Sequence, residues 1–594
     1  MGIGLVLMVV GAKLWLVDTA GSSLPFRDQI DAEGESIIRP WAEDRLEWSA
    51  FFEPHNEHRV VLTKALSWAG VFLNQQWDVY VQLFFNALLH AGLLLVVLRW
   101  LGAYLRGWRY AVLAGLAVLM WILPLDWENT LGGFQSQVYL VLGFSFLQIW
   151  GVLRANRPDW AWWGGHACGA FALGAMASGM LSSVAIIAVL AVQGIRARGL
   201  SALAITSIGL SGLWVVIGLV SRVTVAGHDP LRAGSLGDFV GSLIQALSWP
   251  LDGILPWGLL AALPLVLVGG LILRKRKIAP IDAVFLGMGV WLLLTVVATA
   301  WLRGHGSPLI SRYLTTYYLL VVVQGLALSW KFQRPWQHLL FAGWIIGMAT
   351  GLIGATAATI EKRLPGLAER AQTSEAVMRD YFAQGDEARL RESPAQDLPY
   401  PSAELLIERW QHDSIRGLMP AAVRRPIMPV PAAHSVKDEL PPPPYPIIAS
   451  SPLGDQTQSW VWRSERQPPS TLPVLRFRFN GGLGDPETAL RMRLVSDTAS
   501  VEVVPDGPAR QRWKTVNVMR PAGEWWIEIE DSDTVDCVAI TAPVELGWFS
   551  WGAEKLIKFH FWWINAGLIA FIIGALEFMR VRALGTREAD VPRE

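Results

Sequence analysis

Long apolar stretches recur over residues 1–358 and return once near the end of the chain. VYVQLFFNALLHAGLLLVVLRWL at residues 79–101 is typical of them. A helix needs about 20 mostly apolar residues to cross the hydrocarbon core of a bilayer. The pattern therefore predicts an α-helical multi-pass membrane protein with about twelve spans. The predicted spans cover residues 2–17, 77–101, 107–124, 134–153, 161–178, 180–195, 201–221, 256–273, 281–302, 313–329, 337–358 and 557–579.

A second pattern, with a period of two, appears before the last apolar stretch. VLRFRFNG (474–481) and ALRMRLVS (489–496) alternate apolar and basic residues, and EWWIEIEDS (524–532) alternates apolar and acidic ones. Alternation of this kind is typical of half-buried β-strands. Short strands separated by Gly, Pro and Asp predict a small β-sandwich or jelly roll.

These patterns divide the chain into successive parts. The Pro-rich PPPPYP at 441–446 is expected to be a semi-rigid spacer within the connector. The predicted parts are a transmembrane bundle at 1–358 with a large first outer loop at 18–76, a helical and irregular connector at 359–470, a β-domain at 471–546, a final transmembrane helix at 557–579 and a tail at 580–594.

Composition narrows the class of protein further. The 594 residues are 52% hydrophobic and 17% charged, which is too apolar for a soluble chain of this length. The formal net charge is zero, so no nucleic-acid partner is indicated. Cys168 lies in an apolar stretch and Cys537 in the β-domain, and we expect no disulfide between them.

Charge in the short loops predicts which ends of the helices face the cytoplasm. Basic residues gather in alternate loops, and the positive-inside rule makes those loops cytoplasmic. They include Arg106, Arg109, Arg154, Arg157, Arg196, Arg198, the RKRK at 274–277, Lys331, Arg334, Arg580 and Arg582. The first span carries Lys13 and lacks a preceding basic region, so a signal peptide is the alternative for it. The loops 18–76, 125–133, 222–255, 303–312 and the segment 359–556 then face outward.

Polar residues crowd at one point of the first outer loop, FFEPHNEHR (51–59). We expect PHNEHR to open a helix in which His55 and His58 share one face. A solvated, capped loop is one interpretation, and a polar pocket for a charged substrate is the other. Two histidines and a carboxylate can also hold Zn or Mn, although this spacing alone is a weak metal signal. The pocket residues would be His55, Asn56, Glu57, His58 and Arg59.

Two further polar clusters lie at outer helix ends. LPLDWENTLGGFQSQVYL (123–140) contributes Asp126, Glu128, Asn129, Gln135 and Gln137. Polar groups at membrane depth usually face an interior cavity, and helix–helix hydrogen bonding is the competing interpretation.

The other cluster is WLRGHGSPLISRYLTTYYLL (301–320). An arginine such as Arg312 often only snorkels to the membrane surface. Positive charge is not favoured on the outer side by topology, however, and Arg312 with His305 and Tyr313 suits a phosphate held at membrane depth. His90, inside an apolar span, is better explained as a packing residue.

No P-loop, G-x-S-x-G or H-E-x-x-H motif is present. An activated substrate must therefore arrive through the membrane, and a lipid phosphate donor fits this requirement. An outer carboxylate would then remove the proton of an incoming hydroxyl.

Several stretches resemble a large bacterial group of GT-C-like membrane proteins. They are PHNEHRVVLTKAL, DWENTLGGFQSQVYL, SPLISRY, LPYPSAELLIERW (398–410) and APVELGWFSW (542–551). GT-C enzymes are polytopic glycosyltransferases that use polyprenyl-phosphate sugars, with a carboxylate of the first outer loop at the active site. The resemblance covers nearly the whole chain. It implies a multi-pass protein of the bacterial inner membrane, with its active site and β-domain facing the periplasm.

The resemblance also implies roles for particular residues. Asp28 matches the family's first-loop aspartate and would be the general base. The family pattern continues with a second acidic residue or a tryptophan, whereas this chain has Gln29 and Ile30, so Asp31 is the candidate for the second role. A divalent metal (Mg or Mn) at these carboxylates stays an open alternative, with no metal ligand assigned.

The implied reaction transfers a sugar from a polyprenyl-phosphate donor to an envelope glycan or glycolipid acceptor. Arg312 with Tyr313, Arg59 and His305 would bind the donor phosphate. The pocket would be shaped by His55, Asn56, Glu57, His58, Glu128, Asn129, Gln135 and Gln137, with Glu57 a further candidate base. The β-domain would bind glycan, with Trp460, Trp462, Trp525 and Trp526 as candidate stacking residues.

Three alternatives to this function stay open. A lipid-linked glycan ligase or polymerase also uses outer arginines, together with a lipid diphosphate donor. A glycolipid transporter should carry polar positions throughout its spans and internal repeats. A non-enzymatic scaffold would explain the β-domain but not the pairing of Asp28 with Arg312.

Overall fold

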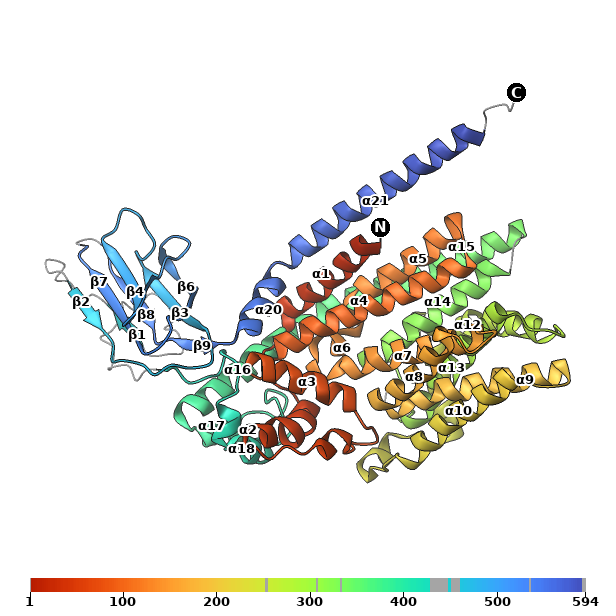
Figure 1. Cartoon of the computed structure of the whole chain (residues 1–594), viewed down its shortest axis with the longest axis horizontal. Helices are drawn as coiled ribbons and strands as arrows, with labels where there is room; N and C mark the ends of the chain where they lie inside the picture. Colours follow the sequence, from red (N-terminus) through yellow and green to blue (C-terminus); the bar gives the residue numbers. More distant parts are fainter. Residues whose placement is uncertain are drawn as a thin grey trace.

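The computed structural model describes residues 2–251, 255–305, 308–331, 334–427, 447–449, 460–533 and 536–589. Helices that run side by side form most of the molecule, and the β-strands gather at one end of it (Figure 1). Among the described residues, ten helices are long and apolar enough to cross a membrane, when the short turns continuous with a helix are counted with it. These helices are α1 (Gly2–Ala20), α4 (Val79–Tyr104), α5 (Gly107–Ile122), α7 (Ser136–Arg154), α9 (Met180–Ala197), α10 (Ala202–Val220), α13 (Pro280–Leu302), α14 (Leu314–Trp330), α15 (Pro335–Ala358) and α21 (His560–Ala589).

The remaining two predicted spans also form helices, α8 and α12. Helix α8 (Trp160–Ala175) has 16 residues. At 1.5 Å per residue it is about 24 Å long, less than the hydrocarbon thickness of a typical bilayer. Helix α12 (Leu255–Leu273) has 19 residues, as many as α1 and α10. Over the described part of the chain, ten of the twelve predicted spans thus stand as candidate membrane spans.

The first and last helices of the bundle lie against each other through glycines. A Cβ at Gly4 of α1 would stand 2.6 Å from the carbonyl oxygen of Gly567 in α21. A Cβ at Gly11 would overlap the backbone of Ile564. Small residues allow two helix backbones to approach closely, which is how apolar helices pack tightly without large side chains between them. Helix α21 therefore packs against α1, although the two lie far apart in the sequence.

The first loop and the predicted connector fold together into a helical layer at the end of the bundle. Leu24, Ile30 and Trp77 of the first loop share one buried cluster with Tyr381 and Trp410 of the connector. The layer comprises η1 (Ile30–Ile38), α2 (Arg39–Ala42), η2 (Trp48–Phe52), α3 (Val61–Asn74), η8 (Thr359–Arg363), α16 (Leu364–Gln384), α17 (Glu387–Glu392), α18 (Ala403–Trp410) and α19 (Asp413–Arg416).

Short elements join the long helices. They are η3 (Pro124–Asp126), α6 (Trp127–Leu131), η4 (Gly133–Gln135), η5 (Ala177–Gly179), η6 (Ala226–Leu231), α11 (Leu236–Ser248), η7 (Ser311–Tyr313) and α20 (Trp548–Lys558). Several of them carry the polar motifs, so the predicted site lies on turns at the ends of packed helices.

The β-region consists of two antiparallel sheets. One has the order β1-β8-β3-β6, with β9 also paired to β3, and the other has the order β2-β7-β4-β5. The strands are β1 (Ile447–Ala449), β2 (Trp460–Arg463), β3 (Val474–Gly481), β4 (Leu490–Ser496), β5 (Ser500–Glu502), β6 (Ala509–Met519), β7 (Trp525–Asp531), β8 (Val538–Thr541) and β9 (Val544–Leu546). The three strands predicted from alternation correspond to β3, β4 and β7.

Both sheets contribute to one buried cluster. Phe477 and Phe479 of β3 and Leu494 of β4 belong to it, together with Ile527 and Ile529 of β7. Strands β1 and β2 come from residues before 471, so the paired β-structure begins within the segment predicted as connector. The spacer predicted at 441–446 and the last tail residues, 590–594, lie outside the described residues, while 580–589 continue α21.

Reciprocal amide contacts attach the β-region to the first loop. Asn74 donates to Ser550 Oγ at 2.8 Å and accepts from the Ser550 backbone N–H at 3.1 Å. Gln76 accepts from the Gly547 N–H at 2.7 Å and donates to the Glu545 carbonyl at 3.0 Å. Because these groups are buried, the four bonds define one orientation of the β-region on the bundle.

Candidate functional site

Asp28 lies on the turn between α1 and η1, at the end of the helical bundle. Its carboxylate is 3.5 Å from His55 Nε2, and about half of its side chain is exposed. The hydrogen bond to His55 lowers the pKa of Asp28, partial burial opposes this, and the charges of His55, Arg312 and Arg27 lower it further. Asp28 is therefore ionised at neutral pH and open to solvent, as a base that accepts a proton must be.

The PHNEHR segment forms a tight turn and not the first turn of a helix, so our prediction was wrong on this point. The backbones of His55 and His58 exchange hydrogen bonds of 2.8 and 3.1 Å, and Asn56 between them has φ of 51°. Asparagine tolerates this left-handed conformation better than most residues. Helix α3 begins only at Val61. The turn directs His55 toward Asp28 and against the Phe134 ring, whose centroid is 5.5 Å away.

Arg312 is positioned by the WENTL segment. Its backbone N–H donates to Glu128 Oε2 at 3.1 Å, and its guanidinium lies 3.4 Å from Glu128 Oε1. Asn129 donates to the Arg312 carbonyl at 3.0 Å. Ser311 accepts from the Glu128 N–H at 3.1 Å and donates to the Leu125 carbonyl at 2.8 Å. These bonds involve mostly the backbone of Arg312, and its side chain is 39% exposed.

The fold brings Asp28 and Arg312 together from distant parts of the sequence. The Arg312 charge is one of the smaller causes that lower the pKa of the Asp28 carboxylate, after the hydrogen bond and the charge of His55. Charges that are not fully buried act on each other over roughly 10 Å at moderate salt, so the two side chains share one end of the bundle. The region therefore combines an ionised carboxylate, an imidazole and a guanidinium at one end of the apolar helices. A negatively charged ligand can meet Arg312 while a hydroxyl group meets Asp28.

Beneath Arg312 lies a buried ion pair that sequence reasoning did not identify. Lys13 Nζ is 2.6 Å from Asp126 Oδ1, and both side chains are almost fully buried. Asp126 Oδ2 accepts from Thr315 Oγ1 at 3.1 Å and lies 3.6 Å from His90 Nε2. Thr315 also accepts from Asn129 at 3.0 Å. The ion pair thus supports the segment that carries Arg312.

Some predicted site residues are occupied by structural partners. Asp31 of the first loop accepts hydrogen bonds from Tyr400 OH at 2.7 Å and from Arg409 Nε at 3.3 Å. Both donors belong to the connector, so Asp31 links the two segments. The Arg59 guanidinium donates to the carbonyls of Phe52 and Ser221. Both side chains therefore already have hydrogen-bond partners within the fold.

Glu57 is paired with a residue for which the sequence indicated no role. Its Oε1 is 2.5 Å from His228 Nδ1 in the 222–235 loop. Burial raises the pKa of Glu57, but the hydrogen bond and charge of His228 outweigh that effect and lower it overall. His228 looked like an ordinary loop residue because its partner comes from a distant segment.

The other predicted residues lie around the site in different environments. Tyr313 accepts from Arg303 Nε at 3.1 Å. His305 is exposed, and Gln135 is half-buried. Gln137 is buried, and its Oε1 has no hydrogen-bond partner among the described residues. Asn56 is 3.2 Å from His55 Nε2.

Glu33 is a buried carboxylate that the sequence did not distinguish from its neighbours. Its Oε2 accepts from Gln82 at 2.9 Å, Ser67 at 2.8 Å, and Gln29 and Trp77 at 3.3 Å each. Burial raises the pKa of Glu33, and the four hydrogen bonds oppose the rise. Since Gln29 directly follows Asp28, this network supports the backbone of the proposed base.

The candidate metal ligands do not converge. Within the described ranges, no group of three or more His, Cys, Asp or Glu side chains has a geometry that could hold a metal ion. Asp28, Asp31 and Glu57 each contact a different partner.

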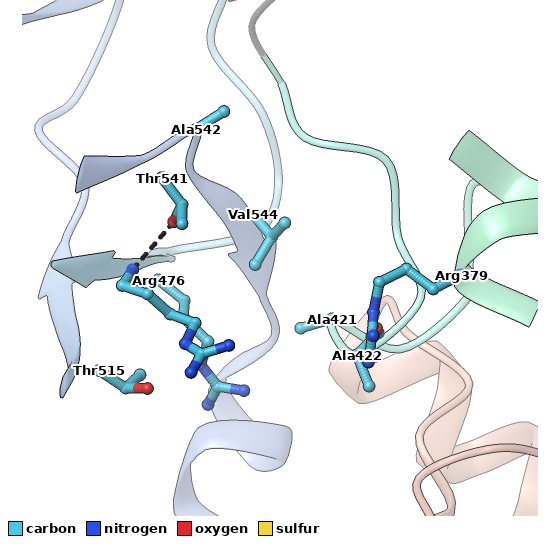
Figure 2. A pocket seen from close by; sticks show the side chains of 9 residues that line it. Arg379, Ala421, Ala422, Arg476, Thr515, Thr541, Ala542 and Val544 are labelled. Carbon is cyan, nitrogen blue, oxygen red and sulfur yellow. Dashed lines mark hydrogen bonds between the residues drawn. The ribbon is translucent and has the colours of Figure 1, made fainter. Parts of the chain in front are cut away.

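A pocket of about 240 Å³ lies elsewhere, between the β-region and the connector (Figure 2). Arg379 enters it from α16, and Arg476 enters it from β3. Arg476 is paired with Glu554 at 2.5 Å. None of the residues that line this pocket belongs to the predicted site.

Two of the candidate stacking residues of the β-region, Trp525 and Trp526, are not open platforms. Trp525 is 1% and Trp526 8% exposed. The guanidinium groups of Arg463 and Arg466 lie 5.3 and 4.9 Å from the Trp526 ring centroid. Trp526 therefore sits on the outer side of its sheet but beneath two arginines.

Comparison with known proteins found no matching family model, no matching curated protein and no matching solved structure.

Proposed function

We propose that the protein is a membrane glycosyltransferase that moves a sugar from a polyprenyl-phosphate donor to an envelope glycan or glycolipid acceptor. The observation that carries the proposal is the convergence of Asp28, His55 and Arg312 at one end of a bundle of apolar helices. A lipid-linked donor can keep its chain beside such helices while its phosphate meets Arg312.

The proposed chemistry is one inverting displacement. Asp28 takes the proton of the acceptor hydroxyl, and the resulting oxygen attacks the anomeric carbon of the sugar. The bond between that carbon and the phosphate oxygen breaks, and its electron pair leaves with the polyprenyl phosphate. Arg312 stabilises the negative charge that the leaving phosphate gains. The His55 imidazole, 3.5 Å from Asp28, holds the carboxylate in place before the reaction.

The same proposal places the bundle in a bacterial inner membrane, with Asp28 and the β-region on the periplasmic side. The basic short loops lie at the ends of the spans away from Asp28, as the positive-inside rule requires. We further propose that the two sheets form a sandwich, because residues of both enclose one buried cluster. No metal enters the proposed mechanism.

A lipid-linked glycan ligase or polymerase is the second candidate function. It is favoured by additional arginines near the site, Arg222 and Arg303, whose charges both act on His58. Such an enzyme would release a lipid diphosphate, which carries more negative charge than a monophosphate.

A transfer assay with purified protein tests the proposal. Radiolabelled polyprenyl-phosphate sugars would be offered together with a crude periplasmic glycan fraction. We expect transfer by the wild type, loss of transfer with retained donor binding in Asp28→Asn, and weakened donor binding in Arg312→Gln. Asp229→Asn, an exposed aspartate paired with Arg232, is the matched control and should transfer normally. Equal transfer by Asp28→Asn and wild type would eliminate Asp28 as the base.

A further inference from the structure

Hydrogen bonds join the PHNEHR turn to the 222–235 loop. Arg59 Nε donates to the Ser221 carbonyl at 3.3 Å. Glu57 Oε1 lies 2.5 Å from His228 Nδ1. Glu57 and Arg59 of the turn therefore contact the middle of this loop and the residue that precedes it, which brings the backbone of Arg222 close to the turn.

The 222–235 loop is joined in turn to the segment before α14. The Ala233 N–H donates to the Trp301 carbonyl at 2.9 Å, and the His305 N–H donates to the Leu231 carbonyl at 3.2 Å. Arg303, between Trp301 and His305, donates from Nε to Tyr313 OH at 3.1 Å. Because Tyr313 directly follows Arg312, this bond places Arg303 near the segment that carries Arg312.

Positive charge accumulates where these three segments meet. Burial lowers the pKa of His58, and the charges of Arg303, His55 and Arg222 lower it further, against the opposing charge of Glu57. Glu57 is already bonded to His228. Among the described residues no carboxylate pairs with Arg222 or Arg303, and no group bonds His58 Nδ1, which is buried.

We propose that Arg222, Arg303 and His58 form a second oxyanion subsite, which takes a phosphate group of a lipid-linked substrate. The inference rests on the proposed function and specifies its substrate class. Guanidinium groups present several N–H donors in the geometry that phosphate oxygens accept, and a histidine nitrogen adds one more. Two cations on neighbouring segments, without a carboxylate partner among the described residues, attract an anion to the space between them.

The phosphate can come from two sources. It can be the second phosphate of a lipid diphosphate whose first phosphate meets Arg312. It can also belong to a second lipid-linked substrate, the acceptor. The shared chemistry is a phosphate oxyanion, and the number and kind of lipids bound distinguish the sources.

Native mass spectrometry of the full-length protein, titrated with polyprenyl monophosphate or polyprenyl diphosphate of equal chain length, tests the subsite. We expect the wild type to prefer the diphosphate by about tenfold. Arg303→Gln and Arg222→Gln should each abolish most of this preference and leave monophosphate affinity unchanged. Arg232→Gln, in the same loop but paired with Asp229 at 2.8 Å, is the matched control. Thermal unfolding of each variant checks that it is folded.

Each outcome has a defined meaning. Binding of two monophosphate lipids by the wild type, with one lost in Arg303→Gln, assigns the subsite to a second substrate. An unchanged diphosphate preference and unchanged stoichiometry in both variants overturn the proposal. Arg312→Gln separates this result from the proposed function. Loss of monophosphate binding there supports the donor site whatever happens at Arg303, and unchanged monophosphate binding contradicts the donor site itself.

Discussion

Lys13 Nζ lies 2.6 Å from Asp126 Oδ1, with both side chains withdrawn from solvent in the apolar bundle. The pair joins α1 to the turn that precedes α6. Asp126 in turn holds Thr315, and Thr315 and the Arg312 carbonyl both accept from Asn129. Lys13, a charge that is unusual in a membrane span, thus helps to hold the segment that carries the proposed phosphate site.

Removing one partner of this pair should cost much more than removing both. Lys13→Met leaves the Asp126 carboxylate buried without its counter-charge, a loss of about 3 to 5 kcal/mol. Lys13→Met combined with Asp126→Asn removes both charges and should recover a large part of that loss. Chemical denaturation in detergent measures the free energies of unfolding. Equal destabilisation by the single and double variants would contradict a coupled pair.

The buried Glu33 network should be needed for stability. Glu33→Ala leaves four donors without their acceptor, and we expect a loss of about 3 kcal/mol or more. Glu33→Gln keeps one acceptor oxygen and should lose less. Glu35→Gln, in the same short helix but only partly buried and paired with Arg39 at 2.7 Å, is the control and should unfold within about 1 kcal/mol of the wild type. Comparable losses for Glu33→Ala and Glu35→Gln would show that the network is dispensable.

Asp78 predicts a dependence of stability on pH. Burial, with the nearby Glu554 carboxylate, raises its pKa from 3.8 to about 7. The folded state therefore favours the protonated carboxyl. The contribution of Asp78 to the free energy of unfolding is greatest below pH 3.8. It falls as the pH rises from 3.8 through 7, by about 4 kcal/mol in total.

Asp78→Asn should remove this dependence, because an amide cannot ionise and can still accept from the Tyr80 N–H. We expect the variant to be more stable than the wild type at pH 8 and similar to it at pH 4. Asp159→Asn changes the equivalent capping residue of α8, which is less buried, and should leave the pH profile unaltered. Thermal unfolding between pH 4 and pH 8 provides the measurement. Parallel curves for Asp78→Asn and wild type would refute the assignment.

The attachment of the β-region should depend on Gly547. A Cβ at this position would overlap Asn74 Oδ1 and stand 2.5 Å from the Asn74 carbonyl oxygen. Gly547→Ala should therefore separate the amide contacts and make the junction more sensitive to limited proteolysis. Gly552 lies in α20, the helix that Gly547 caps, and a Cβ added there meets nothing within 4 Å. The cleavage rate of Gly552→Ala should therefore match the wild type. Identical cleavage of both variants would mean that the junction absorbs the extra methyl group.

The elements of this protein follow from local sequence. Strand β3 was predicted to the residue and helix α4 to within three residues at each end, because hydrophobic length and a period of two are properties of neighbouring residues. PHNEHR was wrongly predicted to open a helix because that prediction also relied on neighbouring residues alone. Helical spacing dominates its sequence, whereas the backbone bonds between His55 and His58 and the left-handed Asn56 decide its shape.

The sequence by itself determined the type of the main elements, apolar helices and alternating strands, and it singled out His55 and Arg312 as polar groups in an apolar chain, whereas Asp28 was indicated by the family resemblance. Only the tertiary structure decided which polar groups meet: Arg312 acts on Asp28, Asp31 is bound by Tyr400, and Lys13 pairs with Asp126. The reason is physical. A buried or half-buried charge must find a partner, but the partner's identity depends on how distant helices pack, and no local pattern encodes that choice.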